Sequence, residues 1–80
     1  MDKFYFTFGS GGSQPYTGGW VEIHADSKGE AIEKFNRAYP PRNMSTYVNC
    51  AFIYRQKEFE ETIMFKENDN LGYACHEIIE

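Results

Sequence analysis

The segment KFYFTF at residues 3–8 carries the clearest strand pattern in the chain. Alternate side chains of a strand point to opposite faces, so Phe4, Phe6 and Phe8 share one face while the two intervening side chains share the other. The first element of the fold is therefore predicted to be a strand with one aromatic face.

The residues that follow predict a hairpin. Residues 9–19 read GSGGSQPYTGG, and this density of glycine disfavours both helix and regular strand. Residues 20–25 then alternate again, with Val21, Ile23 and Ala25 on one face. The glycine-rich loop therefore joins two strands, most simply as an antiparallel pair.

A helix is predicted over residues 28 to about 38. Ser27 stands three residues before Glu30, which is the capping-box arrangement of a helix start. Apolar residues recur at helical spacing after it, and Pro40-Pro41 ends the pattern. This is the best supported helix in the chain.

The second half of the chain is less regular. Residues 50–54 form a continuous apolar run, which predicts a strand buried on both faces. Residues 55–66 fit either helix or strand, and we favour a short helix, while residues 72–79 alternate as a last strand. The chain is thus predicted to be a single α+β domain over residues 1–80, in the order β-β-α-β-(α)-β. Its antiparallel sheet of about four strands would be packed by one or two helices.

Length and composition narrow the function classes. A chain of 80 residues holds one domain, and 18% aromatic residues is far too many for a disordered tail. Twelve Asp and Glu outnumber eight Lys and Arg, and the net charge of −4 argues against direct binding of nucleic acid. No apolar run reaches the roughly 18 residues that span a bilayer, and residues 1–8 lack the pattern of a signal peptide. We therefore expect a cytoplasmic protein without membrane contact.

The thiols and imidazoles do not form a recognisable catalytic or metal motif. Cys50 and Cys75 stand on different predicted strands and are interpreted as buried free thiols. Together with His24 and His76 they show neither the C-x-x-C nor the H-x-x-x-H spacing of a metal site. Their spacing also does not match a catalytic set of nucleophile, base and orienting group. We expect a protein that is not an enzyme and holds no metal and no cofactor. Catalysis through His24 or His76 is kept as the least favoured alternative.

Two segments are candidates for contact with a partner. The glycine-rich loop lacks the Gly-Lys-Ser or Gly-Lys-Thr of a phosphate-binding loop, so it is either a plain flexible hairpin loop or a loop that contacts a partner. The acidic cluster between residues 58 and 69 is either a solvated helix face or a surface that docks onto the basic nucleic-acid groove of another protein. The predicted partner-binding residues are Tyr16, Trp20, Glu58, Glu60, Glu61, Glu67 and Asp69.

Four segments carry a resemblance to known proteins: FYFTFGSG at residues 4–11, VEIHADSKGEAIEKF at 21–35, AFIYRQKEFE at 51–60, and GY at 72–73. In this combination the chain resembles a group of short uncharacterised bacteriophage and prophage proteins. It departs from their pattern by a longer glycine loop and by an insert over residues 40–49. The resemblance implies a phage context, in which genes of this size often encode inhibitors of host defence, including anti-CRISPR proteins.

The leading hypothesis is therefore a phage-encoded binding protein that acts in the host cytoplasm without catalysis. Its expected partner is a host defence protein, such as a CRISPR-associated nuclease or complex, whose nucleic-acid-binding surface it would occlude. The alternative is a protein that sequesters a small nucleotide with the glycine-rich loop and nearby aromatic residues. A homodimer is also left open, because small domains often gain stability by self-association.

Overall fold

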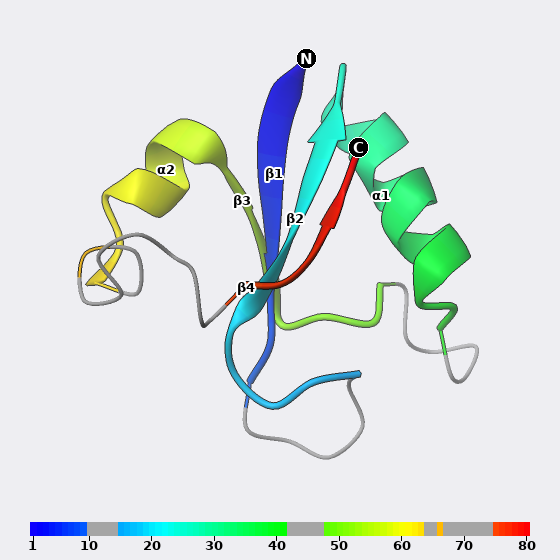
Figure 1. Ribbon diagram of the computed structural model, residues 1–80, viewed down its shortest axis with the longest axis horizontal. Coiled ribbons are helices and arrows are strands. Elements are labelled where there is room, and N and C mark those ends of the chain that lie inside the picture. Colours follow the sequence, from blue (N-terminus) through cyan, green and yellow to red (C-terminus); the bar gives the residue numbers. More distant parts are fainter. Residues whose placement is uncertain (10–14, 42–47, 64–65, 67–74) are drawn as a thin grey trace.

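The computed structural model describes residues 1–9, 15–41, 48–63, 66 and 75–80. Within them the elements follow in the order β1 (Asp2–Thr7), β2 (Trp20–Ala25), α1 (Lys28–Ala38), β3 (Phe52–Arg55), α2 (Gln56–Glu60) and β4 (Cys75–Ile79). The strands form one sheet in the spatial order β3-β1-β2-β4, and Figure 1 shows α1 and α2 on opposite sides of it. The predicted small α+β domain, with strands, helices and chain order as expected, is confirmed.

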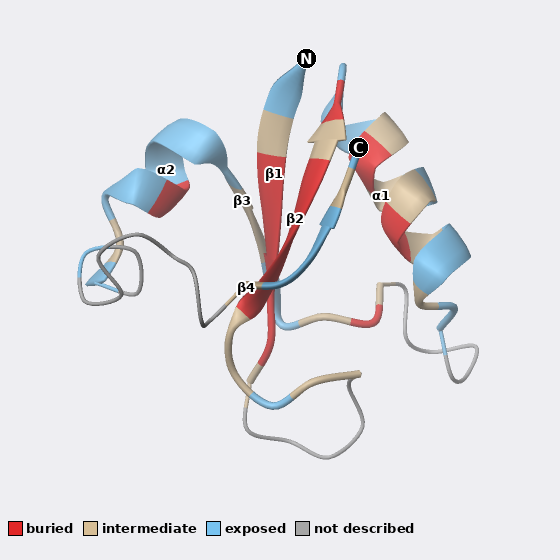
Figure 2. Ribbon diagram, viewed as in Figure 1, coloured by how far each residue is buried: buried red, intermediate tan, exposed pale blue. Residues whose placement is uncertain are grey.

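The central strands carry most of the buried residues, which are coloured red in Figure 2. The register of the antiparallel β1–β2 pair places Phe4 opposite Ile23 and Phe6 opposite Val21. These side chains face α1, where Phe6 stacks on Phe35 with ring centroids 4.5 Å apart. The aromatic face predicted from KFYFTF is therefore the core beneath α1.

The other face of the sheet has a smaller core of its own. Tyr5, Trp20 and Phe59 are its buried members, and Phe59 comes from α2. The rings of Tyr5 and Phe59 stack with centroids 4.2 Å apart, and Trp20 meets Phe59 edge to face at 4.9 Å. A single buried side chain of α2 thus holds this helix on the sheet.

The start of α1 follows the capping pattern in the sequence. The side-chain Oγ of Ser27 accepts a hydrogen bond from the Glu30 amide at 3.1 Å, and Glu30 Oε1 accepts one from the Asp26 amide at 2.8 Å. These contacts satisfy two amides that a helix start would otherwise leave without partners. At the other end, the Tyr39 amide still donates to Phe35 before the chain leaves the helix at Pro40.

The sheet is mixed, so the prediction of a wholly antiparallel sheet is wrong in one strand. β1 pairs antiparallel with both β2 and β3, whereas β4 lies parallel to β2. Ile79 of β4 stands beside Ile23 and packs against the core beneath α1. Alternation fixes which side chains share a face but leaves the direction of a strand open, and for this reason the sequence did not reveal the parallel pairing.

The prediction of a strand buried on both faces over residues 50–54 is also wrong. β3 runs over Phe52–Arg55 and lies at the edge of the sheet, where 57% of Phe52 is exposed. The apolar run reflects partial cover on both faces, because Ile53 packs against the core beneath α1 and Tyr54 packs against the core beneath α2, and both are half-buried. Of the last predicted strand, residues 75–79 are confirmed, and residues 72–74 lie outside the described residues.

Candidate functional site

Tyr16, the predicted anchor of the glycine-rich loop, belongs to a cluster that we call the tyrosine cluster: Tyr16, Tyr39, His76 and Glu77. The Tyr16 ring stacks flat on the His76 ring, with centroids 3.9 Å apart and planes 4° from parallel. Its hydroxyl lies 3.1 Å from that of Tyr39, which in turn donates to a Glu77 carboxylate oxygen. Burial, followed by this hydrogen bond to Glu77, raises the pKa of Tyr39. Tyr16 therefore ties the loop end to α1 and β4, and its role as a partner anchor stays a prediction.

A bulge in β4 assembles this cluster. Cys75 pairs with Trp20 and Glu77 pairs with Val21, so His76 is the extra residue between them. Cys75 consequently packs with the α2-side core while Ile79 packs with the α1-side core, although simple alternation would place both on one face. The bulge turns His76 toward the loop, where its Nε2 lies 2.7 Å from the Gly18 carbonyl oxygen. The sequence holds no signal that would have located this bulge.

Trp20, the second aromatic residue predicted to contact a partner, does not lie on the surface. It is wholly buried against Phe59, and its indole Nε1 meets no hydrogen-bond acceptor within the described residues. The alternation pattern correctly placed Trp20 on the face opposite Val21 and Ile23, but that face is covered by α2. We therefore leave Trp20 out of the candidate contact surface.

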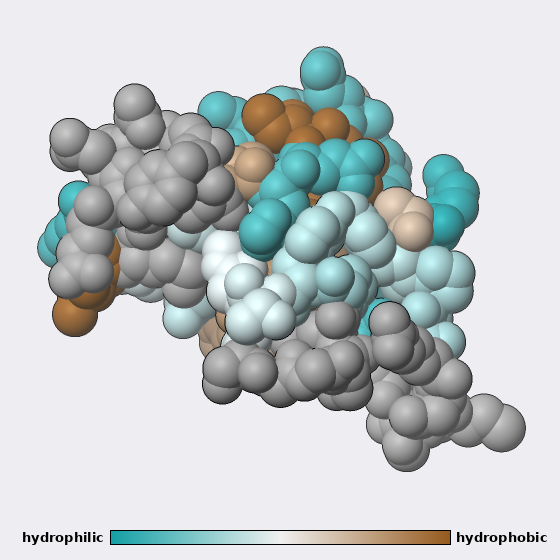
Figure 3. Space-filling model, turned by 60° about the horizontal axis from the view of Figure 1, so that its bottom comes forward, coloured by the Kyte–Doolittle hydropathy of each residue, from teal (hydrophilic) through white to brown (hydrophobic). Residues whose placement is uncertain are grey.

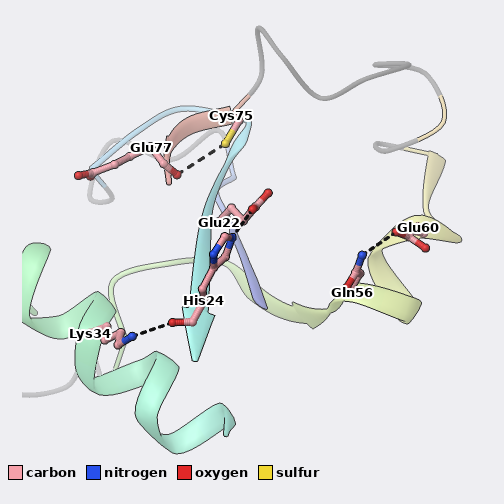
Figure 4. A network of polar contacts seen from close by, with 7 residues as sticks. All are labelled: Glu22, His24, Lys34, Gln56, Glu60, Cys75 and Glu77. Atoms are coloured by element: carbon pink, nitrogen blue, oxygen red, sulfur yellow. Dashed lines mark hydrogen bonds and ion pairs between the residues drawn. The ribbon is translucent and has the colours of Figure 1, made fainter. Parts of the chain in front are cut away.

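The acidic residues of α2 do lie on the surface. Glu58 and Glu60 of α2 and Glu61, which follows it, are all exposed. Glu58 Oε1 accepts from the Arg55 amide at 3.3 Å, and Glu60 Oε2 accepts from Gln56 Nε2 at 3.1 Å, as Figure 4 shows for the latter pair. Neither contact involves a charged side chain as donor, and no ion pair among the described residues includes these three carboxylates. Glu67 and Asp69 lie outside the described residues.

Phe52 brings an exposed aromatic side chain to the edge strand that precedes α2. Its ring lies 4.6 Å from that of Tyr54, and Tyr54 lies 5.8 Å from Phe59 of α2. A line of rings thus leads from the buried core to the exposed edge of β3. We call this region the α2 surface, and it comprises the half-buried Tyr54 and the exposed Phe52, Glu58, Glu60 and Glu61. Sequence reasoning missed Phe52 because it sits in an apolar run that is typical of buried strands.

Further exposed apolar side chains occur elsewhere. Ile63 is 69% exposed and Ile78 is 55% exposed. The face drawn in Figure 3 shows hydrophobic side chains in separate small patches among hydrophilic ones. Single exposed apolar residues are common on protein surfaces, so Ile63 and Ile78 carry less weight than the exposed Phe52 ring, which packs with Tyr54.

The polar groups on the sheet form a different arrangement, which Figure 4 shows well apart from the Gln56–Glu60 contact. His24 Nε2 lies 2.6 Å from Glu22 Oε2, and Glu22 is largely buried. Burial and then the Glu22 carboxylate raise the pKa of both the Tyr5 hydroxyl and the Cys75 thiol. The Cys75 thiol donates to the Glu77 carbonyl at 3.6 Å.

This arrangement lacks the features of nucleophilic catalysis. An activated cysteine needs a lowered pKa or a base within hydrogen-bond reach. Cys75 has neither a lowered pKa nor, in the part of the chain that the structure describes, a hydrogen bond to an imidazole. The same part of the chain holds no group of three or more acidic, cysteine or histidine residues placed to bind a metal.

Comparison with known proteins found no matching family model, no similar curated protein and no similar solved structure. Among the described residues, no helix is long and apolar enough to cross a membrane. The candidate site therefore has to be argued from its own geometry and charge.

Proposed function

We propose that this chain is a non-catalytic, phage-encoded binding protein that inhibits a host defence effector by protein–protein contact through the α2 surface. The observation that carries the proposal is that the exposed Phe52 ring connects through Tyr54 to Phe59 of α2, whose carboxylates Glu58 and Glu60 are exposed together with Glu61. An aromatic anchor surrounded by polar groups is the usual composition of a strong contact site between proteins.

The charge of the α2 surface indicates which kind of partner it fits. Three carboxylates within four residues resemble the closely spaced negative charges of a nucleic-acid backbone, and a basic groove attracts both. A protein that occupied such a groove with these carboxylates would exclude the nucleic acid. This mode of action, like that of an anti-CRISPR protein, requires no catalysis and no direct contact between this chain and nucleic acid.

The decisive experiment is affinity capture from a bacterial host lysate with a matched pair of variants. Glu58→Gln, Glu60→Gln and Glu61→Gln together remove three charges while keeping acceptor oxygens for Arg55 and Gln56. The control combines Asp26→Asn, Glu33→Gln and Glu80→Gln, which lie exposed elsewhere and change the net charge equally.

We expect the wild type and the control to retain the same nucleic-acid-binding defence protein, and the α2 variant to retain at least tenfold less. Added guide RNA or target DNA should release the retained protein if the two compete for one groove. Equal retention by both variants would contradict the proposal. An empty capture together with a nucleotide released from the heated protein would instead favour the nucleotide-sequestering alternative.

A further inference from the structure

A cavity of about 360 Å³ opens where the start of β1 meets the corner between β3 and α2. This size falls within the range of small-molecule pockets in proteins. The cavity lies at the Asp2 end of β1, whereas the glycine-rich loop follows the other end of that strand. It is lined by Asp2, Lys3, Phe4, Arg55, Gln56, Lys57 and Glu60.

The lining is unusually rich in cations for this acidic chain. It contains three of the eight Lys and Arg residues: Lys3, Arg55 and Lys57. Among the described residues, the one ion pair joins His24 to Glu22, so these three cations face the cavity without carboxylate partners. Of the two acids in the lining, Glu60 already accepts a hydrogen bond from Gln56.

Contacts with the Phe4 ring and with Glu58 hold Arg55 at the edge of the cavity. Its guanidinium carbon lies 5.6 Å from the centroid of the Phe4 ring, and Phe4 is wholly buried in the sheet. A guanidinium packed over an aromatic face keeps its edge N–H groups available for two parallel hydrogen bonds to a phosphate. Its backbone amide is fixed as well, because it donates to Glu58.

We propose that this cavity binds a small organic phosphate, with the phosphate group on Arg55, Lys3 and Lys57. Three cations against the two carboxylates Asp2 and Glu60 give the lining a net positive charge, which attracts the doubly negative phosphomonoester. Charge-assisted hydrogen bonds are the strong ones in such sites. A bare phosphate would leave most of the volume filled with water, whereas a sugar phosphate occupies both the cationic end and the remaining space. This site differs from the glycine-rich loop and does not depend on the proposed inhibitory function.

The test is a titration of the ¹⁵N-labelled full chain, followed by amide chemical shifts, with three probes. Ribose 5-phosphate tests the whole site, inorganic phosphate tests the anion alone, and ribose tests the sugar alone. We expect saturable shifts at residues 2–4 and 55–60 with ribose 5-phosphate, binding at least threefold weaker with inorganic phosphate, and no shifts with ribose. Equal affinity for the two phosphates, or no saturable shift at these residues, would overturn the proposal.

Single substitutions show which cations contribute to ribose 5-phosphate binding. Arg55→Gln should weaken ribose 5-phosphate binding at least tenfold and Lys57→Gln about threefold, whereas Lys28→Gln, which removes an exposed charge on α1, should leave it unchanged. Lys57 is exposed, so its variant remains informative even if Arg55→Gln does not fold. An equal loss in Lys28→Gln and Lys57→Gln would show general charge attraction and would overturn the site.

Discussion

The two faces of the sheet are covered in different ways. Beneath α1, an eleven-residue helix with a capped start buries Ala31 and Phe35 against a row of aromatic and aliphatic side chains. Beneath α2, a five-residue helix contributes Phe59 alone to the core and leaves Phe52 exposed at the edge. The α1 side therefore supplies most of the buried apolar area that stabilises the fold, and the α2 side presents the surface that we propose for binding.

The largest expected effect is on the α1 side. Phe35→Ala removes the ring that stacks on Phe6 and also contacts Phe8 and Tyr39. Truncating a buried phenylalanine leaves a cavity, and we expect the free energy of unfolding to fall by about 4 kcal/mol in urea denaturation. Since small domains are stable by only about 5–15 kcal/mol, the variant should be close to unfolding. A loss below about 1 kcal/mol would show that α1 does not close the main core.

The corresponding change on the α2 side should be more local. Phe59→Ala removes the contacts with Tyr5 and Trp20, and we expect a loss of about 3 kcal/mol, the lower end for such truncations. Hydrogen exchange should show loss of protection in α2 while amides of α1 and β2 stay protected, because a single side chain holds α2 in place. Uniform loss of protection would mean that the two cores unfold as one unit.

A third test compares a thiol on the α1 side with an ordinary cysteine. Burial raises the pKa of Cys50 to about 11, and Cys50 packs against the α1-side core. In a Cys75→Ala background at pH 8, alkylation of Cys50 should be on the order of 100-fold slower than that of an unfolded peptide control, because the thiolate is the nucleophile. A raised folded pKa also means that this thiol's contribution to stability is complete below the ordinary thiol pKa and is lost as pH rises through about 11. Alkylation at the peptide's rate would show that Cys50 is open to solvent.

A smaller effect is expected at the start of α1. Ser27→Ala removes the hydrogen bond from the Glu30 amide, and thermal denaturation should show a loss of about 1 kcal/mol. Ser27→Asp keeps an acceptor at the same position and should restore the stability. No change in Ser27→Ala would mean that water replaces the cap at no cost.

These contrasts explain how far the sequence could predict the structure. Alternation and the Ser27–Glu30 cap were enough to place β1, β2 and α1, because local spacing determines the faces of such elements. The parallel direction of β4 and the bulge at His76 depend on contacts with Trp20 and Val21, which lie more than 50 residues away. Local patterns do not contain that information.

In the candidate site, too, local sequence predicted some features, while others depend on contacts between distant segments. The exposed acids of α2 could be predicted from composition, since charged helix residues are rarely buried. Trp20 and Phe52 were assigned the wrong exposures, because an apolar residue in a strand is buried or exposed according to which helix covers its face. The position of α2, which Phe59 fixes, decides which side chains on that face are buried and which are exposed.

Phe52→Thr should have the smallest effect on stability and a large effect on binding. Threonine suits a strand, and the Thr7 hydroxyl bonds to the backbone carbonyl of Phe52, so that contact survives the change. The exposed ring loses little buried area, and we expect the free energy of unfolding to change by less than about 0.5 kcal/mol. Capture of the host partner should nevertheless fall at least tenfold, because an aromatic anchor at the centre of an interface contributes about 2 kcal/mol or more.

The matched control is Phe52→Tyr, which keeps a ring at the edge of β3 and should retain the partner. If Phe52→Thr unfolds as readily as Phe35→Ala, the ring belongs to the core and the α2 side is not an open binding surface. If Phe52→Thr folds and captures the partner as the wild type does, the carboxylates act without an aromatic anchor. Either outcome would remove the distinction drawn between the two faces, since it rests on an aromatic residue that the fold itself does not need.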